Sequence, residues 1–448
     1  MINGLGTFDY KNGEKKIEAE FYFDWSPKAL SRRSLLQIEA VKNETNIFQE
    51  NFMTLPNHSW ELITKTKDNR QFIAQNLFLK SVSESEDKNG ISYIFGCSSI
   101  EIGDRNEQFE YIEFYFPNVF IGFDEFEKKG SFNFLNKSNL TLEYNDTYTL
   151  TFSGLNETSI HEKKKEIISK GNDISTLKVI VQKASSNHIY FSEANKVIEL
   201  VSDLMSFVYD GPVSWIHAIA YQHNEEVFNY FRDVKYPRLG TFRKLIRFEF
   251  PYILTSYISK AFTEYKSFSE EKQKAIRTFI NGLHFSSERL VFPAPFTSLG
   301  SSIEDYIERS IPETESRYIS KPVRKKMIDP SFELWVREHI LPLLNEVDRE
   351  DFSESNLKQK TNALLQRNLK SRIINLLHHH DIIFDQNWVT DFVKKRNDAA
   401  HGAYIHEKDD FLKWTRMAAL LEKIILKQLN YTGEYIDWSE SPPQQKSF

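Results

Sequence analysis

The sequence predicts an α+β protein in which a β-rich N-terminal sandwich or open barrel precedes an all-helical C-terminal bundle. Short runs of alternating apolar and polar residues, typical of half-buried strands, recur up to about residue 182. Beyond about residue 192, apolar residues recur at the spacing of an amphipathic helix. The predicted domains are a β-rich module at 1–190, a mixed helical connector at 191–262, a helical domain at 263–438 and a disordered tail at 439–448.

Length and composition indicate a globular protein with more than one domain. The 448 residues, 40% of them hydrophobic and 27% charged, are enough to bury more than one core. The 36 Phe and 20 Tyr residues favour a β-rich portion. Because the net charge is −6, the protein is not a general polyanion binder, and any contact with RNA requires a local basic patch.

The cysteine count and the N-terminus indicate the compartment. The single cysteine, Cys97, excludes an internal disulfide framework and fits a reducing environment. The N-terminal residues lack the apolar segment that export requires, and no apolar run approaches the roughly twenty residues that span a bilayer. We therefore expect a cytoplasmic protein without a membrane contact.

The strand pattern is clearest between residues 16 and 25. Apolar side chains from Ile17 to Trp25 occupy the odd positions, and mostly polar ones occupy the even positions. Similar short runs lie at 60–64, 71–79, 91–102, 111–123, 148–152 and 178–182. Many short strands joined by connections that contain Asn, Asp, Ser and Gly favour an antiparallel sandwich or an open barrel.

The first predicted helix begins near Ser192 and is stopped by Asp210-Gly211-Pro212. A basic-aromatic stretch at 231–250 follows. It could help to hold RNA, but we interpret it as a solvated face over buried aromatic residues. The capping boxes at 267–270 and 301–304 predict two further helix starts.

Four more helices are predicted after these starts. Asp329-Pro330 opens one, with Trp335, Val336, Ile340 and Leu343 in its apolar stripe and a kink at Pro342. A long helix is predicted from about Asn356 to His379. The remaining two are a helix around Trp388 and a last helix at 410–429.

One stretch, Arg396-Asn397-Asp398-Ala399-Ala400-His401-Gly402, combines features that suggest chemistry. Trp388, Phe392 and Arg396 are spaced four apart, so the Arg396 guanidinium should emerge at a seam between helices. Gly402 is a candidate left-handed helix stop. A permanent cation and a titratable imidazole then lie about one turn apart, and such a pair can stabilise and protonate a phosphate.

This stretch resembles the signature of HEPN domains, and most closely that of the ApeA-like HEPN proteins of bacterial abortive-infection defence against phage. The specific part of the resemblance covers about the last 180 residues, from the helix before Gly282 onward. It implies a HEPN-like helical bundle with Arg396, Asn397 and His401 as catalytic residues. It also implies RNA cleavage without a metal or other cofactor, in a homodimer or higher homo-oligomer formed through the helical domain.

In the implied reaction a 2′-hydroxyl attacks the adjacent phosphate, and the protein supplies proton transfer and charge stabilisation. His401 is the candidate acid or base, Arg396 neutralises the phosphorane, and Asn397 orients the phosphate or the histidine. Lys394 and Lys395 are candidate RNA contacts. Glu304 or Asp305 could reach the cleft from another helix.

Other pairs and clusters compete with this assignment. Arg277 with His284, and Arg372 with His378 or His379, have a similar spacing. The run His378-His379-His380 resembles a metal site, but adjacent helical residues point about 100° apart, so we predict no metal there. Alternatively, Arg396 pairs with Asp398 or the acidic loop, and His401 only caps a helix.

The resemblance implies that the nuclease is triggered by infection, with a phage-derived protein as a candidate trigger, and that it then cuts host RNA. Transfer RNA is the candidate substrate. The N-terminal module is expected to sense or bind a partner. The alternatives are a non-catalytic HEPN protein that binds RNA or a nucleotide, and a regulatory subunit that is inactive without its partner.

Overall fold

The structure is a computed structural model of the chain. It describes residues 2–10, 15–23, 30–31, 36–42, 60–85, 90–121, 137–154, 162, 165, 172–173, 175–185, 188–209, 211–233, 243–247, 251–288, 292–312, 316–343 and 354–448. The chain divides into two units, Met1–Lys266 and Ser267–Phe448. The second unit thus begins close to the predicted start of the helical domain at residue 263. The predicted boundary at residue 190 falls inside the first unit.

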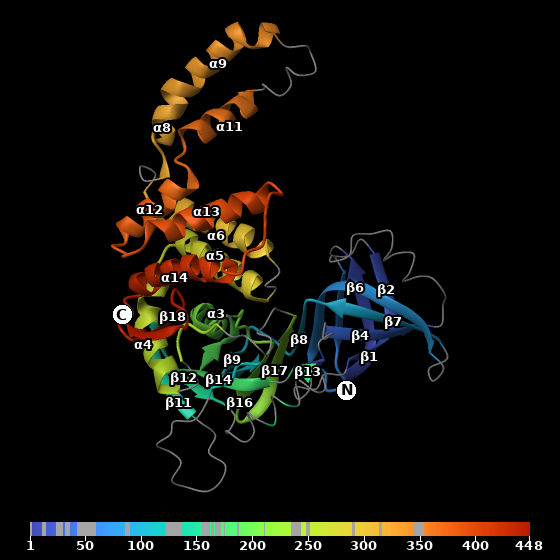
Figure 1. Cartoon of the computed structure of the whole chain (residues 1–448). Coiled ribbons are helices and arrows are strands. Elements are labelled where there is room, and N and C mark those ends of the chain that lie inside the picture. The colour runs from blue at the N-terminus through green and yellow to red at the C-terminus, as the bar shows by residue number, and fades with distance from the viewer. Residues whose placement is uncertain are drawn as a thin grey trace. The chain divides into compact units, whose positions relative to one another are not determined.

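Six strands of the first unit form a barrel, in the order β6-β5-β1-β2-β4-β7 and back to β6 (Figure 1). They are β1 (Ile2–Tyr10), β2 (Lys15–Phe23), β4 (Leu36–Lys42), β5 (Trp60–Lys65), β6 (Gln71–Ser85) and β7 (Gly90–Cys97). The predicted alternation in β2 is confirmed, since the odd residues from Ile17 to Phe23 are buried. They join an aromatic core in which the ring centroids of Phe21 and Phe72 lie 4.9 Å apart. Trp25 lies outside the described residues.

The barrel is closed, whereas the sequence predicted a sandwich or an open barrel. Closure depends on β6, which is 15 residues long and pairs with two barrel neighbours. Its residues up to Leu77 pair with β5, and its residues from Phe78 onward pair with β7. Closure gives each of these six strands a partner on both sides. Residue alternation identifies a strand and its buried face but does not determine which strands pair around the ring.

The same sheet continues beyond the barrel through β8, which pairs with both β6 and β17. The order from there is β17-β16-β10-β14-β12-β11, with every pair antiparallel. These strands are β8 (Ser99–Ile102), β10 (Tyr111–Pro117), β11 (Lys137–Tyr144), β12 (Asp146–Ser153), β14 (Ser175–Lys183), β16 (His217–Gln222) and β17 (Glu225–Arg232). Four two-residue strands pair outside this sheet: β3 (Leu30–Ser31), β9 (Gln108–Phe109), β13 (Asn172–Asp173) and β15 (Ile189–Tyr190).

Two helices of the first unit pack with this sheet. The predicted helix near Ser192 is α3 (Phe191–Tyr209), and it ends directly before the predicted stop. Phe191 packs against the rings of Phe114 and Phe228 in the sheet. The helix α4 (Pro251–Ser267) contacts α3, since the Tyr257 hydroxyl donates to the Leu204 carbonyl. The predicted connector at 191–262 therefore contains part of the central sheet, because β16 and β17 lie between β10 and β8.

The second unit is mainly helical, as predicted. Its packed helices are α5 (Glu270–Glu288), α6 (Ala294–Ser310), α12 (Leu369–His379), α13 (Gln386–Ala400) and α14 (Asp410–Gln428). The helix α6 contacts each of the other four, and Phe296 of α6 lies 5.8 Å from Phe392 of α13 between ring centroids. The motif helix α13 is therefore held against α6 by buried aromatic side chains.

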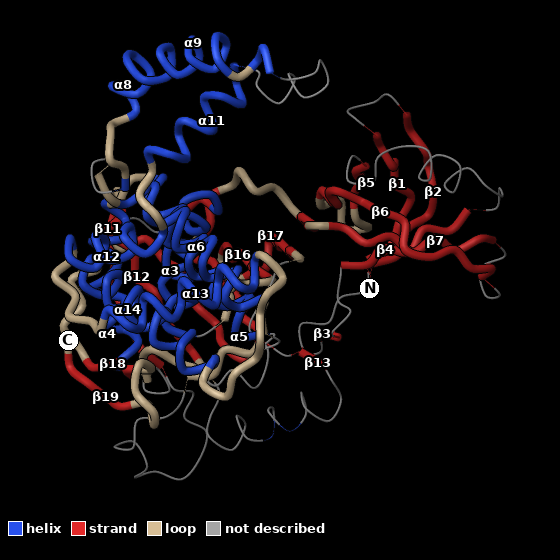
Figure 2. The backbone as a smooth tube through the Cα atoms, turned by 45° about the horizontal axis from the view of Figure 1, so that its top comes forward, coloured by secondary structure: helices blue, strands red, loops and turns tan. Residues whose placement is uncertain are grey.

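The described residues 316–343 and 354–365 contribute to a helical arm. The arm contains α8 (Lys321–Val323), the π-helical turn η2 (Arg324–Ile328), α9 (Asp329–His339), the 3-10 turn η3 (Leu341–Leu343) and α11 (Glu354–Leu365). The helices α9 and α11 lie side by side and stand apart from the packed helices in both views (Figures 1 and 2). The predicted apolar stripe of α9 is buried only in part, since Val336 is buried whereas Trp335 and Leu343 are exposed.

Several predicted helix limits differ from those in the structure. The helix α6 begins at Ala294 rather than near Ser301, with Pro295 in its first turn and Phe296 already buried. The predicted helix from 356 to 379 is broken, because the Asn368 side chain caps a new helix by accepting from Ser371 N at 2.9 Å. Instead of a kink at Pro342, α9 ends before it.

The predicted disordered tail contains a strand. Residues of β19 (Gln444–Ser447) pair with β18 (Glu434–Asp437) in an antiparallel hairpin. Asp437 is buried and holds this hairpin on α14 through Lys423, at 3.0 Å. Asp437 also pairs with Lys446 of the tail at 2.9 Å, so a buried carboxylate holds a segment whose polar composition suggested disorder.

Candidate functional site

The motif lies at the C-terminal end of α13, as predicted. Asp385 caps the start of this helix by accepting from Asn387 N, and Phe392 is buried along it. The helix ends at Ala400 with His401 as its C-cap residue. Gly402 has a φ of +72°, and the Ala403 amide donates to the Asp398 carbonyl at 2.8 Å. This is the glycine-ended Schellman arrangement, so the predicted helix stop is confirmed.

Arg396 is positioned by α6. Its Nη2 donates to Glu304 Oε1 at 2.8 Å, and its Nη1 donates to Asn397 Oδ1 at 3.2 Å. The stem of Arg396 lies against Gly300, where an added Cβ would be 2.8 Å from the Arg396 Cγ. The guanidinium therefore sits at the α6–α13 seam that the spacing predicted, and its side chain keeps a quarter of its surface exposed.

Of the two acidic residues considered as contacts from another helix, Glu304 reaches Arg396 and Asp305 does not. Asp305 instead accepts from Arg309 Nε at 2.8 Å on the same helix. The partner of Arg396 is thus on another helix, rather than Asp398 or the acidic loop. Pairing with Glu304 leaves Arg396 partly exposed, and such surface ion pairs contribute only about 0–1 kcal/mol. An incoming phosphate can therefore replace the carboxylate.

His401 lies at the surface, one turn beyond Arg396. Its backbone amide donates to the Asn397 carbonyl at 3.0 Å, which is the capping role considered above. The imidazole is exposed, and within the described ranges it forms no hydrogen bond with another side chain. Arg396 and Asn397 therefore lie in the last turns of α13 and His401 is its C-cap residue, with His401 exposed to solvent.

The two lysines beside the motif lie in different environments. Lys394 is exposed and can contact a phosphate in solution. Lys395 is buried, and its Nζ donates to the Ile405 carbonyl at 2.8 Å and pairs with Asp410 at 3.2 Å. The prediction of Lys395 as an RNA contact is therefore wrong, because its ammonium points into the protein. Neighbouring helical positions face about 100° apart, so one lysine of the pair turns inward.

Lys395 belongs to a network that holds the loop after the motif. The Asp410 carboxylate accepts from the Tyr404 hydroxyl at 2.6 Å and from Glu407 N at 2.8 Å. Burial raises the pKa of Asp410, but these hydrogen bonds and Lys395 outweigh it and keep this pKa below its ordinary value. Burial and the bond to Asp410 raise the pKa of Tyr404. The charged residues here stabilise the start of α14.

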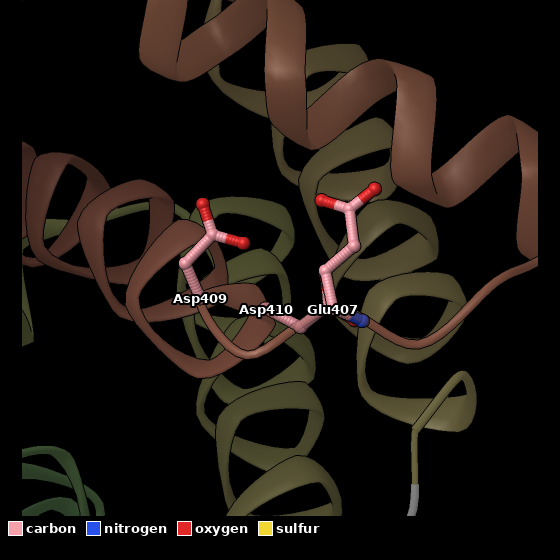
Figure 3. Close-up of side chains that lie close together, drawn as sticks. All are labelled: Glu407, Asp409 and Asp410. Atoms are coloured by element: carbon pink, nitrogen blue, oxygen red, sulfur yellow. The ribbon is translucent and has the colours of Figure 1, made fainter.

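Three carboxylates of this loop are close enough to suggest a cation site. Figure 3 shows Glu407, Asp409 and Asp410 close together at the start of α14. One carboxylate oxygen of each lies within 4.8 Å of those of the others. All three carboxylates already form ion pairs with lysines. Lys413 pairs with Glu407 and Asp409, and Lys395 pairs with Glu407 and Asp410. Hydrogen bonds from Lys413 and Lys395 lower the pKa of Glu407. We interpret the three carboxylates as a salt-bridge network.

A second charged cluster, not anticipated from the sequence, lies beside Arg396. Glu308, one turn along α6 from Glu304, is 3.5 Å from Arg372 Nη2 and 3.6 Å from Arg317 Nη2. Both arginines are buried. Burial lowers the pKa of Arg372, whereas Glu308 and Glu304 raise it. The sequence contained one signal for this cluster, which is the four-residue spacing of Glu304 and Glu308 on α6. It contained no signal for the two arginines, because they come from segments outside α6.

The histidines of the competing motifs at 378–380 lie at the C-terminal end of α12. His378 and His379 are exposed at the end of α12, and the two rings of His379 and His380 are nearly perpendicular, at 89°. His380 is half-buried 3.2 Å from the Gln428 amide nitrogen, and burial lowers its pKa to about 4. Arg372 faces Glu308 in this region. The side chain of His284 lies outside the described residues.

The basic-aromatic stretch at 231–250 is described only in part. The Arg232 guanidinium lies 3.6 Å from the centroid of the Trp215 ring and pairs with Glu199. Arg243 is buried. Arg232 and Arg243 therefore pack within the first unit, in keeping with the structural interpretation. Lys235 and Arg238 lie outside the described residues.

In the described part of the chain, every helix is too short or too polar to cross a bilayer.

Comparison of the chain with family models, curated proteins and solved structures gives no match.

Proposed function

We propose that this chain is a metal-independent endoribonuclease of the HEPN type, with its site at Arg396, Asn397 and His401. The observation that carries the proposal is an exposed histidine at the end of α13, five residues after an arginine whose guanidinium α6 holds in place. Glu304 and Gly300 of α6 hold the Arg396 side chain, and the Schellman end of α13 presents His401 to solvent. A phosphate bound there meets a fixed positive charge and a group that can transfer a proton.

The proposed step is an attack of the ribose 2′-oxygen on the adjacent phosphorus. The bond from phosphorus to the 5′-oxygen breaks, which leaves a 2′,3′-cyclic phosphate and a 5′-hydroxyl. His401 transfers a proton at the 2′-oxygen or the 5′-oxygen, and Arg396 neutralises the charge that builds on the phosphorane oxygens. Asn397 binds the Arg396 Nη1 and keeps the guanidinium plane oriented.

The biological setting follows from the motif resemblance. We propose a cytoplasmic toxin of an anti-phage abortive-infection system that cuts host RNA, with transfer RNA as the candidate substrate. Infection, through a phage-derived protein, releases the activity. Two copies joined through the helical unit would place two motifs across one cleft, and the β-rich unit would receive the trigger.

The test is cleavage of RNA in the presence of EDTA. Wild-type protein, Arg396→Ala and His401→Ala are incubated with total bacterial RNA, and the same variants are expressed in cells sampled before and after phage infection. His378→Ala, on an exposed histidine of the competing motif, is the matched control. Cleaved ends are examined for a cyclic phosphate and a 5′-hydroxyl.

Cleavage by wild type and His378→Ala, but not by the two site variants, supports the proposal. Cleavage that survives in both site variants contradicts the site. Products with 5′-phosphates contradict the mechanism. If neither the purified protein nor infected cells show cleavage and the protein still binds RNA, the chain is the non-catalytic binding protein instead.

A further inference from the structure

The base of the helical arm carries a local basic surface. Residues 316–328 contain the five cations Arg317, Lys321, Arg324, Lys325 and Lys326 and no Asp or Glu, although the chain as a whole has a net charge of −6. Two of these cations are buried with acidic partners, since Arg317 faces Glu308 and Arg324 faces Asp329 at 3.3 Å. Lys325 and Lys326 are exposed on the π-helical turn. Their charge therefore faces solvent.

An exposed aromatic ring lies in the same segment. Tyr318 is 58% exposed, and the Arg367 guanidinium lies 4.6 Å from the centroid of its ring. The backbone fixes this pair, because Tyr318 N donates to the Leu365 carbonyl at 2.9 Å and Arg367 N donates to the Ser316 carbonyl at 3.1 Å. A fixed, accessible aromatic ring with an arginine beside it is the kind of surface on which an unpaired base stacks.

This surface is connected to the motif through α6. Glu304 binds Arg396, and Glu308 lies opposite Arg317, which directly precedes Tyr318. Residues four apart on a helix are separated by about 6 Å along its axis, so Arg396 and the arm base contact the same face of α6. From Tyr318, the chain can extend over at most about 25 Å before it reaches Lys325. A single strand of a few nucleotides can span this distance.

We infer that Tyr318, Lys325 and Lys326 form a binding surface for a single-stranded RNA segment that flanks the phosphate held at Arg396. This inference rests on the proposed nuclease function and names a second contact for its substrate. Tyr318 stacks on a base, and the two lysines contact phosphates. A duplex would not suit the ring, because paired bases do not offer their faces. The basic charge on an acidic protein matches a polyanion.

The experiment measures binding of full-length protein to a fluorescent 2′-O-methyl oligonucleotide of about 12 nucleotides. This probe keeps the bases and phosphates of RNA but lacks the attacking hydroxyl, so the wild-type protein cannot cleave it by the proposed step. Binding is measured over a range of salt concentrations for wild type, Lys325→Ala/Lys326→Ala, Tyr318→Ala and Tyr318→Phe. Lys65→Ala/Lys67→Ala removes two exposed lysines of the first unit and is the charge-matched control.

The double lysine variant is expected to reduce the magnitude of the salt slope by about 1.4 and to weaken binding roughly 10- to 30-fold at about 0.1 M salt. Tyr318→Ala should weaken binding about 5- to 100-fold, because a stacked base is lost. Tyr318→Phe keeps the ring and should bind as wild type does. The Lys65/Lys67 control should retain the wild-type salt slope.

Wild-type affinity and slope in both arm variants overturn the inference, and so does a wild-type protein that does not bind the probe. A change of oligomeric state in the arm variants, with RNA binding unchanged, shows that the arm contacts a second copy instead. Cleavage of unmodified RNA is assayed in parallel. Cleavage with intact binding in the arm variants overturns only the arm surface. Lost binding in the arm variants, together with no wild-type cleavage either in the purified protein or in infected cells, overturns only the nuclease.

Discussion

Arg396 of α13 donates a hydrogen bond of 2.8 Å from Nη2 to Oε1 of Glu304 in α6. The two residues are 92 positions apart, so the contact joins distant parts of the sequence. The carboxylate accepts from a guanidinium N–H that could otherwise donate to a phosphate. The pair is partly exposed on both sides, and its contribution to stability is therefore small.

Glu304→Gln is expected to tighten RNA binding up to about five-fold at low salt, because it removes a negative charge that competes with phosphate. The free energy of unfolding should change by less than about 1 kcal/mol. Fluorescence anisotropy and urea unfolding measure the two effects. Weaker binding would instead mean that Glu304 positions Arg396 for its ligand.

Gly300→Ala is expected to displace Arg396, because the new Cβ would lie 2.8 Å from the Arg396 Cγ. Helix stability should change by less than about 1 kcal/mol, since alanine is a better helix former than glycine. Cleavage should fall at least about 10-fold, because misplaced catalytic groups lose rate steeply. Ser301→Ala, at the exposed neighbouring position, is the control. Equal cleavage by both variants would show that the position of Arg396 does not limit the reaction.

Lys395→Met and Lys394→Met should distinguish the structural role of Lys395 from the RNA-binding role proposed for Lys394. Lys395→Met leaves the buried Asp410 carboxylate without its ammonium partner, and we expect a loss of about 2–4 kcal/mol in the free energy of unfolding. Lys394→Met, at an exposed position, should change stability by less than about 0.5 kcal/mol but weaken RNA binding. Chemical unfolding and anisotropy test both variants. The reverse pattern would contradict the assignment.

His217 should make the first unit sensitive to acid. Burial lowers its pKa to about 3, although the hydrogen bond with Asn229 opposes this effect. His217 binds a proton near pH 6.5 in the unfolded chain, but in the folded chain it stays neutral until the pH falls to about 3. The stability contribution is therefore complete above pH 6.5, and it falls by about 1.4 kcal/mol per pH unit as the pH drops toward 3.

His217→Gln should remove this slope, so that wild type loses about 2 kcal/mol more than the variant between pH 6.5 and pH 5. His223→Gln, at an exposed histidine, is the matched control. Urea unfolding followed by the fluorescence of Trp215 and Trp60 provides the measurement. Parallel pH curves for wild type and His217→Gln would contradict the burial argument.

The sequence predicted the features that depend on residues close in the chain. The alternation in β2 fixed its buried face, and the glycine after His401 fixed the end of α13. The same local logic failed where a signal was ambiguous. Ser301 lies in a sequence typical of a helix cap, yet it lies inside α6, because a helix start seven residues earlier buries Phe296 and Leu299.

By itself, the sequence determined the α+β division, the periods of the main strands and helices, and a motif that presents a cation and an imidazole at a helix end. These follow from side-chain spacing and backbone preference within a few residues. Only the tertiary structure decided that the barrel closes through β6, that Glu304 and Gly300 hold Arg396, and that Lys395 turns inward to Asp410. Each of these depends on packing between segments far apart in the chain, about which local spacing carries no information.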